Sequence, residues 1–511
     1  MTTQSIPQLS WGASGPALLK NIWQRRQASL WLEGLGLFSL FILIFALIQF
    51  ATPSLIGNDG YYHIKLAQIM RQQGLHPDFP WLPFTVLNSS AYVDHHFLYH
   101  VLLIPFTFGD LRMGAKWASI IFPALTFLSI WMLLRGQRVR YAALWTLGLF
   151  AVSDAFLYRM SMPRTQAVSL LVMVVGLHLI LTGRHRWLLP LSFLFVWLYD
   201  AFPLMLIVAG AYTAAKLLLE QKLDHRPLLY TACGIGLGLL INPYFPNNLL
   251  FIYHHLFPKL TDATATSVGR EWYPYETWTL VENSGGALAL VALGIVALGL
   301  RDRRMSISTA TMLFLTLLFA TLLFRSRRFI EYFPAFALLF GVLSLQPFIE
   351  QGRRANGWLR RGLPLALALI VLVTAVGSVQ AGQTSVQESK PHDRFAEAAA
   401  WLEQNTPAGS LVFQTDWDDF TRLFYYNTHK TYTLGLDPTY MQLHDPALYD
   451  LWVDLTRGRV ETPAETITAN FGARFILSDL QHKGFMREAN DDPNIKEVYR
   501  DEYAVIYEIA N

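Results

Sequence analysis

The chain has 511 residues, of which 53% are hydrophobic and only 15% are charged. Soluble domains usually carry about a quarter charged residues, so this composition excludes an ordinary soluble protein. The formal net charge of +3 gives no sign of a nucleic-acid partner. The single cysteine excludes a disulfide framework and a cysteine-rich metal site.

Apolar windows that are long enough to cross a bilayer recur along the first 382 residues. They predict about eleven transmembrane helices, at 34–52, 114–134, 140–153, 165–183, 187–201, 203–219, 227–242, 285–300, 307–324, 329–349 and 362–382. The apolar segment 97–108 is shorter, and we interpret it as an interfacial helix of the first outer loop. Counting it as a span would reverse the orientation of everything after it.

Basic residues set the orientation, because Lys and Arg concentrate on the cytoplasmic side of membrane proteins. With eleven spans and a cytoplasmic N-terminus, the inner segments hold Lys20, Arg25, Arg26, Arg135, Arg138, Arg140, Arg184, Arg186, Lys222, Arg226, Arg301, Arg303, Arg304, Arg353, Arg354, Arg360 and Arg361. Three long regions then lie outside, at 53–113, 243–284 and 383–511. The sequence therefore predicts an inner or plasma membrane protein whose C-terminal region is periplasmic or otherwise extracytoplasmic.

One outer turn breaks this charge rule. Arg325, Arg327 and Arg328 lie between two spans on the predicted outer side. A positive cluster at that membrane edge favours an anionic partner. Contact with lipid phosphates is the alternative interpretation.

Residues 383–511 have more charges and mixed apolar periods in place of continuous apolar runs. Helices are predicted at 392–404, 445–457 and 463–470, and strands at 410–414, 474–478 and 503–509. The predicted fold is thus a polytopic α-helical membrane domain over 1–382 and a soluble C-terminal α/β domain over 383–511.

Candidate chemistry begins directly after the first predicted span, at Gly57-Asn58-Asp59-Gly60-Tyr61-Tyr62-His63. A carboxylate at the end of a membrane helix can bind a divalent cation or act as a general base. The alternative is a helix-terminating turn, which is common for Asn-Asp-Gly. The same loop holds Asp94-His95-His96 and His100, whose spacing matches no metal signature, so hydrogen bonding is the favoured interpretation.

Further polar residues reach the same predicted face from distant parts of the chain. Asp154, Asp200 and Glu282 lie at outer helix ends, and Glu271 lies among the aromatic residues of the second outer loop. In the C-terminal region, a strand is followed by Thr415-Asp416-Trp417-Asp418-Asp419-Phe420. An aspartate there could cap a helix, but capping does not require Trp417.

Four of these segments resemble motifs of the GT-C superfamily of membrane glycosyltransferases, and most closely the catalytic subunit of oligosaccharyltransferase in its single-subunit bacterial and archaeal forms. The similar segments are Asn58-Asp59-Gly60-Tyr61, Thr279-Leu280-Val281-Glu282, Arg328-Phe329 with Tyr332 and Pro334, and Asp416-Trp417-Asp418-Asp419-Phe420. Their order and their placement on one face carry the resemblance.

The resemblance implies roles for named residues. Asp59 and Glu282 would be catalytic. The same two residues would hold a divalent cation (Mg²⁺ or Mn²⁺), together with Asp154. Arg328, helped by Arg325 and Arg327, would bind the donor phosphate, and the acceptor would contact Trp417, Asp418 and Tyr61. One departure is clear: where the family has a second acidic pair, this chain reads Met162-Pro163-Arg164-Thr165-Gln166.

The implied activity is transfer of a sugar or oligosaccharide from a polyprenyl-phosphate-linked donor to a protein or glycan acceptor, at the outer face of the lipid bilayer. A related alternative is an enzyme of the same fold that modifies a lipid or a cell-wall glycan. A non-catalytic scaffold or transport component is the third hypothesis. Transporters usually carry charged or broken helices at the bilayer midplane, whereas the candidate residues here gather at one face.

Overall fold

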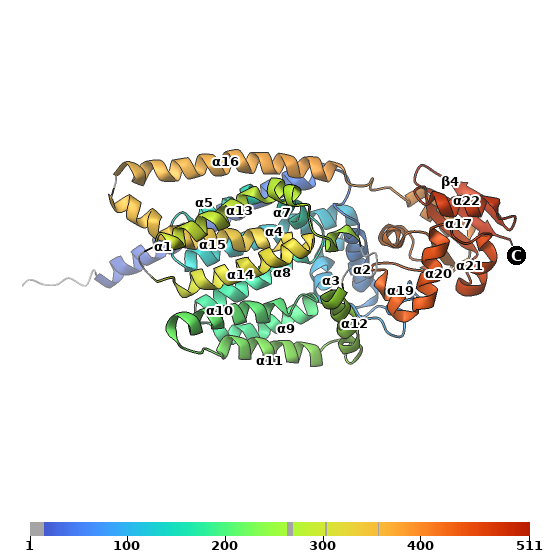
Figure 1. Cartoon of the computed structure of the whole chain (residues 1–511), viewed down its shortest axis with the longest axis horizontal. Helices are drawn as coiled ribbons and strands as arrows, with labels where there is room; N and C mark the ends of the chain where they lie inside the picture. The colour runs from blue at the N-terminus through green and yellow to red at the C-terminus, as the bar shows by residue number, and fades with distance from the viewer. Residues whose placement is uncertain (1–14, 263–268, 302–303, 356, 511) are drawn as a thin grey trace, which may run out of the picture.

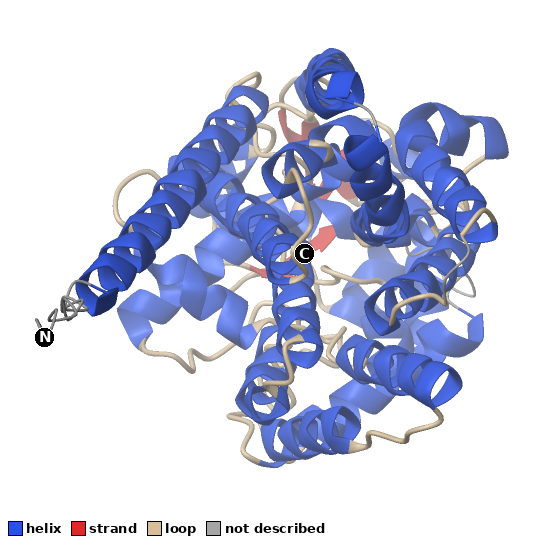
Figure 2. Ribbon diagram, turned by 90° about the vertical axis from the view of Figure 1, so that its left-hand side faces the viewer, coloured by secondary structure: helices blue, strands red, loops and turns tan. Residues whose placement is uncertain are grey.

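The computed structural model describes residues 15–262, 269–301, 304–355 and 357–510. Long helices lie side by side at one end of the molecule, and the C-terminal elements form the other end (Figure 1). Figure 2 looks onto the helical end, with the strands behind it. The α-helices before residue 390 are α1 (Gly15–Gln49), α2 (Asp59–Gln73), α3 (Phe97–Leu103), α4 (Leu111–Gly136), α5 (Ala142–Leu147), α6 (Leu149–Val152), α7 (Asp154–Met160), α8 (Gln166–Leu181), α9 (Leu188–Leu198), α10 (Leu204–Glu220), α11 (Arg226–Leu240), α12 (Asn247–Asp262), α13 (Thr277–Gly299), α14 (Ile307–Arg325), α15 (Phe333–Ala355) and α16 (Gly357–Gln387).

Six helices are long and apolar enough to cross a membrane: parts or all of α1, α4, α13, α14, α15 and α16. Several of them expose large apolar side chains. On α16, Leu365 is 71% exposed and Val373 is 63% exposed. A continuous apolar face of this kind is unfavourable in water and fits contact with lipid tails. The prediction of a polytopic helical membrane protein is confirmed.

Described helices lie at all eleven predicted spans, but five of these segments form helices too short to be counted among the six: α5 with α6, α8, α9, α10 and α11. The number of crossings therefore stays a prediction. The segment 97–108 is helical, as α3 and the short 3-10 helix η1 (Ile104–Thr107). Its interfacial position also stays a prediction.

Packed aromatic rings join three of the bundle helices. Phe41 and Phe45 stand four residues apart on α1, so they share a face. Both rings pack on Phe127 of α4, at 5.8 and 5.2 Å between ring centroids, and on Phe150 of α6. All four side chains are fully buried. Edge-to-face packing of this kind stabilises the bundle beyond the burial of area alone.

The C-terminal region contains α17 (Ala396–Asn405), β1 (Leu411–Gln414), α18 (Phe420–Tyr426), β2 (Thr431–Tyr432), α19 (Thr439–His444), α20 (Pro446–Thr456), α21 (Pro463–Phe471), β3 (Phe475–Asp479), α22 (Lys483–Asp491), β4 (Ile495–Arg500) and β5 (Ala504–Ile509). The strand order is β2-β1-β3-β5-β4. β1 pairs in parallel with β2 and β3, whereas β5 runs antiparallel to β3 and β4. The predicted α/β fold of this region is confirmed.

Both faces of the sheet are covered at its central strand β3, where every residue is buried. Successive residues of β3 alternate between two apolar clusters: Phe475 and Leu477 pack with residues of α17 and α18, and Ile476 packs with residues of α21 and α22. This alternation follows from the two-residue period of a strand. The cluster on the α17 side also includes Tyr62 of α2 and other residues of the segment 53–113.

Residues 53–113 are hydrogen-bonded to the C-terminal region as well. The Trp81 carbonyl accepts from the backbone N–H of Tyr432 in β2, at 2.8 Å, and the Trp81 indole N–H donates to the Thr428 carbonyl, also at 2.8 Å. The Asn58 amide donates to the Asp418 carboxylate, and the Asn58 carbonyl accepts from Arg422 Nε at 3.1 Å. These hydrogen bonds hold the C-terminal region against the residues at the start of α2 and around Trp81.

Candidate functional site

A cavity of about 110 Å³ is lined by residues of α2, α12 and α19, among others. Figure 1 shows these helices between the long helices and the C-terminal elements. The cavity lining is mostly charged, aromatic and imidazole side chains, and comprises Asp59, Tyr62, His63, His95, His96, Arg164, Thr165, Gln166, Tyr199, Asp200, His255, Glu271, Trp272, Arg328, Trp417, Leu436, Asp437 and Tyr440. Polar groups that converge in one concave site are the usual mark of a binding or catalytic centre.

Asp59 is the first residue of α2, where negative charge is favoured by the helix dipole. Its Oδ2 lies 2.5 Å from Arg164 Nη2. Gly60 permits this close approach, because a Cβ on Gly60 would collide with the Pro163 ring. The glycine of the first motif thus brings the start of α2 against the loop that carries Arg164.

Three arginines converge on Glu271, which lies in the short 3-10 helix Arg270–Trp272 before α13. Glu271 Oε2 lies 2.9 Å from Arg159 Nη2 and 3.1 Å from Arg164 Nη1, and Oε1 lies 3.2 Å from Arg328 Nη1. Arg159 also donates through Nε to Glu331 at 2.7 Å. The three arginines are balanced by three carboxylates, because Arg164 also pairs with Asp59. Arg164 and Arg328 line the cavity, where their guanidinium groups can contact an anionic ligand.

Arg328 connects this cluster to an aromatic wall. Its Nη2 donates to the Tyr199 hydroxyl at 2.6 Å, and its guanidinium lies 4.8 Å from the centroid of the Trp272 ring. A planar guanidinium held on several sides is oriented to bind a phosphate through two hydrogen bonds. Burial lowers the pKa of Arg328, but Tyr199, Glu271 and Glu331 together raise it by more than burial lowers it. The pKa of Arg328 therefore lies well above the usual range.

Burial of Glu271 disfavours its charged form, but the positive charges of Arg164, Arg328 and Arg159 are stronger. They hold the pKa of Glu271 well below its ordinary value of 4.5. The stabilisation that this pair network gives is therefore complete above about pH 4.5 and is lost as the pH falls through the lower, folded-state pKa.

We expect Glu271→Gln to destabilise the folded protein by about 2 kcal/mol at pH 7, less than for a fully buried pair because these side chains keep some contact with solvent. The difference between wild type and variant should shrink as the pH falls below 4.5, because the Glu271 carboxylate of the unfolded wild type then binds a proton that the folded protein does not yet bind. Thermal unfolding in detergent micelles between pH 3 and pH 7 measures this. Equal thermal unfolding midpoints of wild type and Glu271→Gln at pH 7 would contradict a stabilising role of the Glu271 ion pairs.

A row of three buried groups leads away from the cavity. His63 Nδ1 lies 2.8 Å from His100 Nε2, and His100 Nδ1 lies 2.7 Å from Asp94 Oδ2. His63 stands four residues after Asp59, so the two share one face of α2 and both line the cavity.

A second polar row joins the bundle to the C-terminal region. Asp200 Oδ2 lies 2.5 Å from His255 Nε2, and His255 Nδ1 lies 3.2 Å from the Tyr440 hydroxyl of α19. Because the three residues come from the end of α9, from α12 and from α19, this row fixes the C-terminal side of the cavity against the bundle.

The structure brings together three of the predicted site residues, namely Asp59, Arg328 and Trp417, around the cavity. Glu282 lies exposed on α13 and does not line it. Asp154 also lies outside the lining and accepts a hydrogen bond from the Ala155 N–H at 2.8 Å.

The other predicted residues do not line the cavity. Arg325 is exposed. Arg327 donates to the carbonyls of Tyr273 and Pro274, at 3.2 and 2.9 Å. Tyr61 is buried beneath the Arg422 guanidinium, 4.3 Å from its ring centroid. Asp418 contacts Asn58 and lies 3.4 Å from Lys390.

Sequence reasoning assigned no role to Arg164, Tyr199 or the ring of Tyr440, although all line the cavity. Arg164 lies in the segment 162–166, where the related family has an acidic pair and this chain has none. That missing pair was the only feature of the sequence that could have pointed to Arg164. Glu271 and Asp200 were singled out as outer-face residues but without a function. Their partners come from other loops, which no local pattern identifies.

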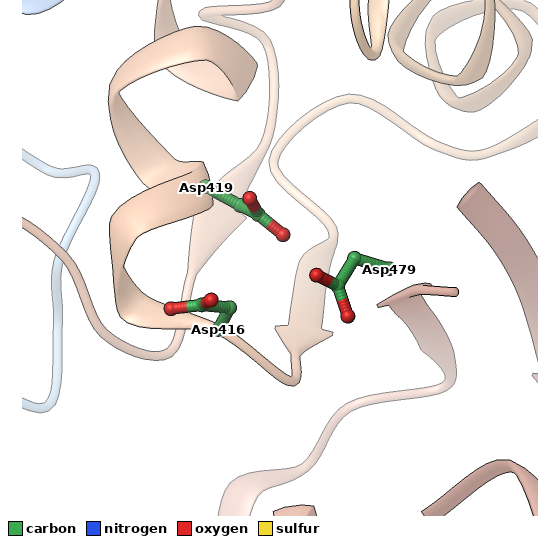
Figure 3. Close-up of side chains that lie close together, drawn as sticks. All are labelled: Asp416, Asp419 and Asp479. Atoms are coloured by element: carbon green, nitrogen blue, oxygen red, sulfur yellow. The ribbon is translucent and has the colours of Figure 1, made fainter. Parts of the chain in front are cut away.

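One group of carboxylates among the described residues is close enough to hold a metal ion: Asp416, Asp419 and Asp479, with ligand atoms within 4.8 Å of one another. Figure 3 shows the three side chains converging at the ends of β1 and β3. Arg394 Nη2 lies 3.3 Å from Asp479 and 3.8 Å from Asp419, and His482 Nδ1 lies 2.5 Å from Asp479. This acidic cluster lies outside the cavity lining.

The expected cation ligands do not form such a group. Within the described ranges, Asp59, Asp154 and Glu282 do not converge on one point. At Asp59, the Arg164 guanidinium instead bridges to Glu271. An organic cation thus lies between two carboxylates, so the residues around Asp59 do not fit a divalent ion.

No profile of a known sequence family matches this chain, and no curated protein sequence matches it. Solved structures do. The oligosaccharyltransferase of Archaeoglobus fulgidus in its apo form aligns with a TM-score of 0.68 and 14% identity, over 88% of this chain and 70% of that one.

Two other solved structures are similar. ArnT from Cupriavidus metallidurans, bound to undecaprenyl phosphate, aligns with a TM-score of 0.57 and 16% identity, over 97% of this chain and 98% of that one. The arabinofuranosyltransferase AftD from Mycobacteria aligns with a TM-score of 0.52 and 13% identity, over 93% of this chain and 40% of that one. The expected GT-C fold is confirmed.

Proposed function

We propose that this chain is a membrane glycosyltransferase that moves a sugar or oligosaccharide from a polyprenyl-phosphate-linked donor to an acceptor. The observation that carries the proposal is the cavity that Arg164, Arg328 and Asp59 line together with Trp417. The fold supports it, since the similar solved structures include one bound to undecaprenyl phosphate and an archaeal oligosaccharyltransferase in complex with an inhibitory peptide and a dolichol-phosphate.

In this proposal, the arginines bind the donor and the carboxylate of Asp59 binds the acceptor. Arg328 and Arg164 bind the donor phosphate and stabilise the negative charge that develops on it as the bond to the sugar breaks. Asp59 orients the nucleophilic group of the acceptor toward the sugar carbon. Trp417 faces the acceptor, and Asp418 is its neighbour in the chain, whereas Tyr61 is buried beneath Arg422. Arg327 and Arg325 extend the positive surface toward the membrane edge.

The site faces the outer side of the membrane in this proposal. The N-terminus is cytoplasmic and residues 383–511 are periplasmic or extracytoplasmic, because the basic residues of the loops would then lie mainly inside. The donor's polyprenyl chain stays in the bilayer, and its phosphate reaches the cavity at the surface.

A deletion strain tests this function. Cells that lack the chain should accumulate the unused lipid-linked sugar and lose one class of surface glycan, both of which mass spectrometry detects. Membranes of that strain contain unused donor and unmodified acceptor. Adding purified wild-type protein to them should form the missing glycan. A deletion strain with unchanged lipid-linked sugars and unchanged surface glycans would refute the proposal.

The family resemblance implies a Mg²⁺ or Mn²⁺ ion, but the proposed reaction does not use one, because Arg164 already neutralises Asp59. We expect EDTA treatment followed by gel filtration to leave the transfer rate within about twofold of the untreated protein, since guanidinium groups supply the charge that a metal ion would otherwise supply. The membrane assay measures this. A large loss that added Mg²⁺ or Mn²⁺ restores would place a cation in the mechanism.

The acceptor decides between the two enzymatic hypotheses. If the missing glycan is attached to protein, the chain acts as a protein glycosyltransferase, whereas loss from a lipid or cell-wall polymer identifies the second class. A scaffold or transport component would alter glycans without forming product when the purified protein is added to the membranes.

A further inference from the structure

The row that Asp94, His100 and His63 form is built for proton movement. Asp94 and His63 are each 5% exposed and His100 is fully buried, so water does not compete for their hydrogen bonds. Both distances, 2.7 and 2.8 Å, are those of good hydrogen bonds. Only His63 reaches the cavity, because neither Asp94 nor His100 lines it.

The carboxylate at one end sets the direction of the row. A carboxylate is an acceptor only, so His100 carries its hydrogen on Nδ1 and donates it to Asp94. In a neutral His100, Nε2 then holds a lone pair, which accepts from His63 Nδ1. A neutral His63 that donates from Nδ1 has its own lone pair on Nε2, the remaining nitrogen of the cavity-lining imidazole.

Asp59 alone is poorly placed to keep a proton. Protonating its carboxylate would break the 2.5 Å ion pair with Arg164, which in turn bridges to Glu271. Transfer of a sugar to an acceptor nevertheless releases one proton from the nucleophilic group. The cavity therefore needs a second base close to Asp59, and His63 lies one helical turn away on the same face.

We propose that His63 is the general base of the transfer reaction, with His100 and Asp94 as the positioning residues that hold its Nε2 lone pair toward the acceptor. This role rests on the proposed glycosyl transfer. Neither the family resemblance nor the sequence patterns pointed to it.

The bond between hydrogen and the acceptor atom breaks, its proton moves to His63 Nε2, and its electron pair forms the new bond to the sugar carbon. The bond from that carbon to the phosphate oxygen breaks, and its electron pair leaves on the polyprenyl phosphate, which Arg328 and Arg164 neutralise. The His63 Nδ1 proton passes to His100 Nε2, which leaves an imidazolium beside the Asp94 carboxylate.

The electrostatics favour this relay over storage of the proton on His63. Burial first, and then the charges of His100, Arg164 and His95, hold the pKa of His63 well below its ordinary value of 6.5. His63 is therefore neutral at physiological pH, as a base must be. Passing the positive charge to His100 moves it away from Arg164 and next to a carboxylate.

The test uses the full-length protein in deletion-strain membranes. His63→Ala should lower the transfer rate by about 100-fold, the scale of a lost general base. Added imidazole should restore part of that rate in His63→Ala and none in Asp59→Asn. His429→Ala is the matched control, because this exposed histidine lies in the C-terminal region outside the cavity and should leave the rate unchanged.

The outcomes separate the two proposals. A wild-type protein that transfers sugar while His63→Ala keeps more than half of its rate would overturn the role of His63 and leave the proposed function standing. A wild-type protein that forms no product would instead refute the proposed function, and the relay is then decided by spectroscopy.

Nitrogen-15 spectra of histidine-labelled wild-type protein in lipid bilayers report the relay without any substrate. We expect both His63 and His100 to carry hydrogen on Nδ1, and Nε2 of His63 to be unprotonated, with the signals assigned by their loss in His63→Gln and His100→Gln. A hydrogen on His63 Nε2 in the resting protein would overturn the proposal, because that nitrogen could not then accept a proton.

The positioning role of Asp94 has its own readout. Asp94→Asn keeps the shape but can donate to His100 through its amide, so the fixed direction of the row is lost. We expect a mixture of His63 tautomers in the nitrogen-15 spectrum of this variant and a lower kcat with little change in KM. An unchanged spectrum would remove Asp94 from the relay.

Discussion

Asp59→Asn should lower sugar transfer by at least about 100-fold while the protein stays folded. The substitution preserves the volume of the side chain but removes the charge that pairs with Arg164 at 2.5 Å. Without that charge, Arg164 loses one of its two anchors, and the acceptor loses the group that orients it. The rate of product formation in deletion-strain membranes measures the effect.

Asp454→Asn is a suitable control, because this carboxylate pairs with Arg459 on the exposed surface of α20. Isolated surface ion pairs contribute about 0–1 kcal/mol, so the control should transfer sugar at the wild-type rate. Full transfer by Asp59→Asn in the same membranes would rule out the catalytic interpretation of Asp59.

The second large effect is expected at the donor phosphate. Arg328→Ala should weaken binding of undecaprenyl phosphate by about 30-fold, which corresponds to about 2 kcal/mol for a lost charge-assisted hydrogen bond. Arg328→Lys should recover only part of the affinity, since an ammonium cannot reach Tyr199 and Glu271 together with a phosphate. Native mass spectrometry of the purified protein with added undecaprenyl phosphate measures both.

Arg474→Ala controls for the general loss of a positive charge. This half-exposed arginine pairs with Glu508 of β5, in the C-terminal sheet and outside the cavity lining. Arg327→Ala tests a finer point: its guanidinium holds backbone carbonyls, so its loss should weaken binding less than the loss of Arg328. Equal binding by wild type and Arg328→Ala would remove Arg328 from the phosphate site.

Much of the fold could be predicted because lipid imposes a simple rule on the sequence. Every backbone polar group in the bilayer must be satisfied within a helix, so spans read as long apolar runs. The runs at 114–134 and 307–324 correspond to α4 and α14. Segments such as 187–201 were harder, since α9 covers only Leu188–Leu198 and its flanks form a short 3-10 turn and an extended residue.

In the C-terminal sheet too, only the strands with a clear apolar pattern could be predicted from the sequence. Strands β1, β3 and β5 are buried and apolar, and each was predicted to within one residue of its observed start. β4 was missed because it is an edge strand whose Lys496, Glu497 and Arg500 face solvent, so its composition resembles a loop. β2 has only two residues, which is too short for any period to be read.

The candidate site was predicted only where one residue carries the signal. Asp59, Arg328 and Trp417 each stood out locally, as a carboxylate after a span, a charge on the unexpected side and a tryptophan among aspartates. The pairing of Arg164 with Asp59 joins residues 105 positions apart by number, and the histidine row depends on how α3 packs on α2. Contacts of this kind exist only after tertiary packing.

The contact between Asn58 and Asp418 links residues 360 positions apart, directly beside Asp59. During synthesis, the first outer loop is made long before the C-terminal sheet exists. The start of α2 therefore gains this neighbour only after residue 418 has been made, whereas Phe41 and Phe45 of α1 can pack on Phe127 of α4 much earlier in synthesis. A chain that stops before residue 418 lacks the contact beside Asp59.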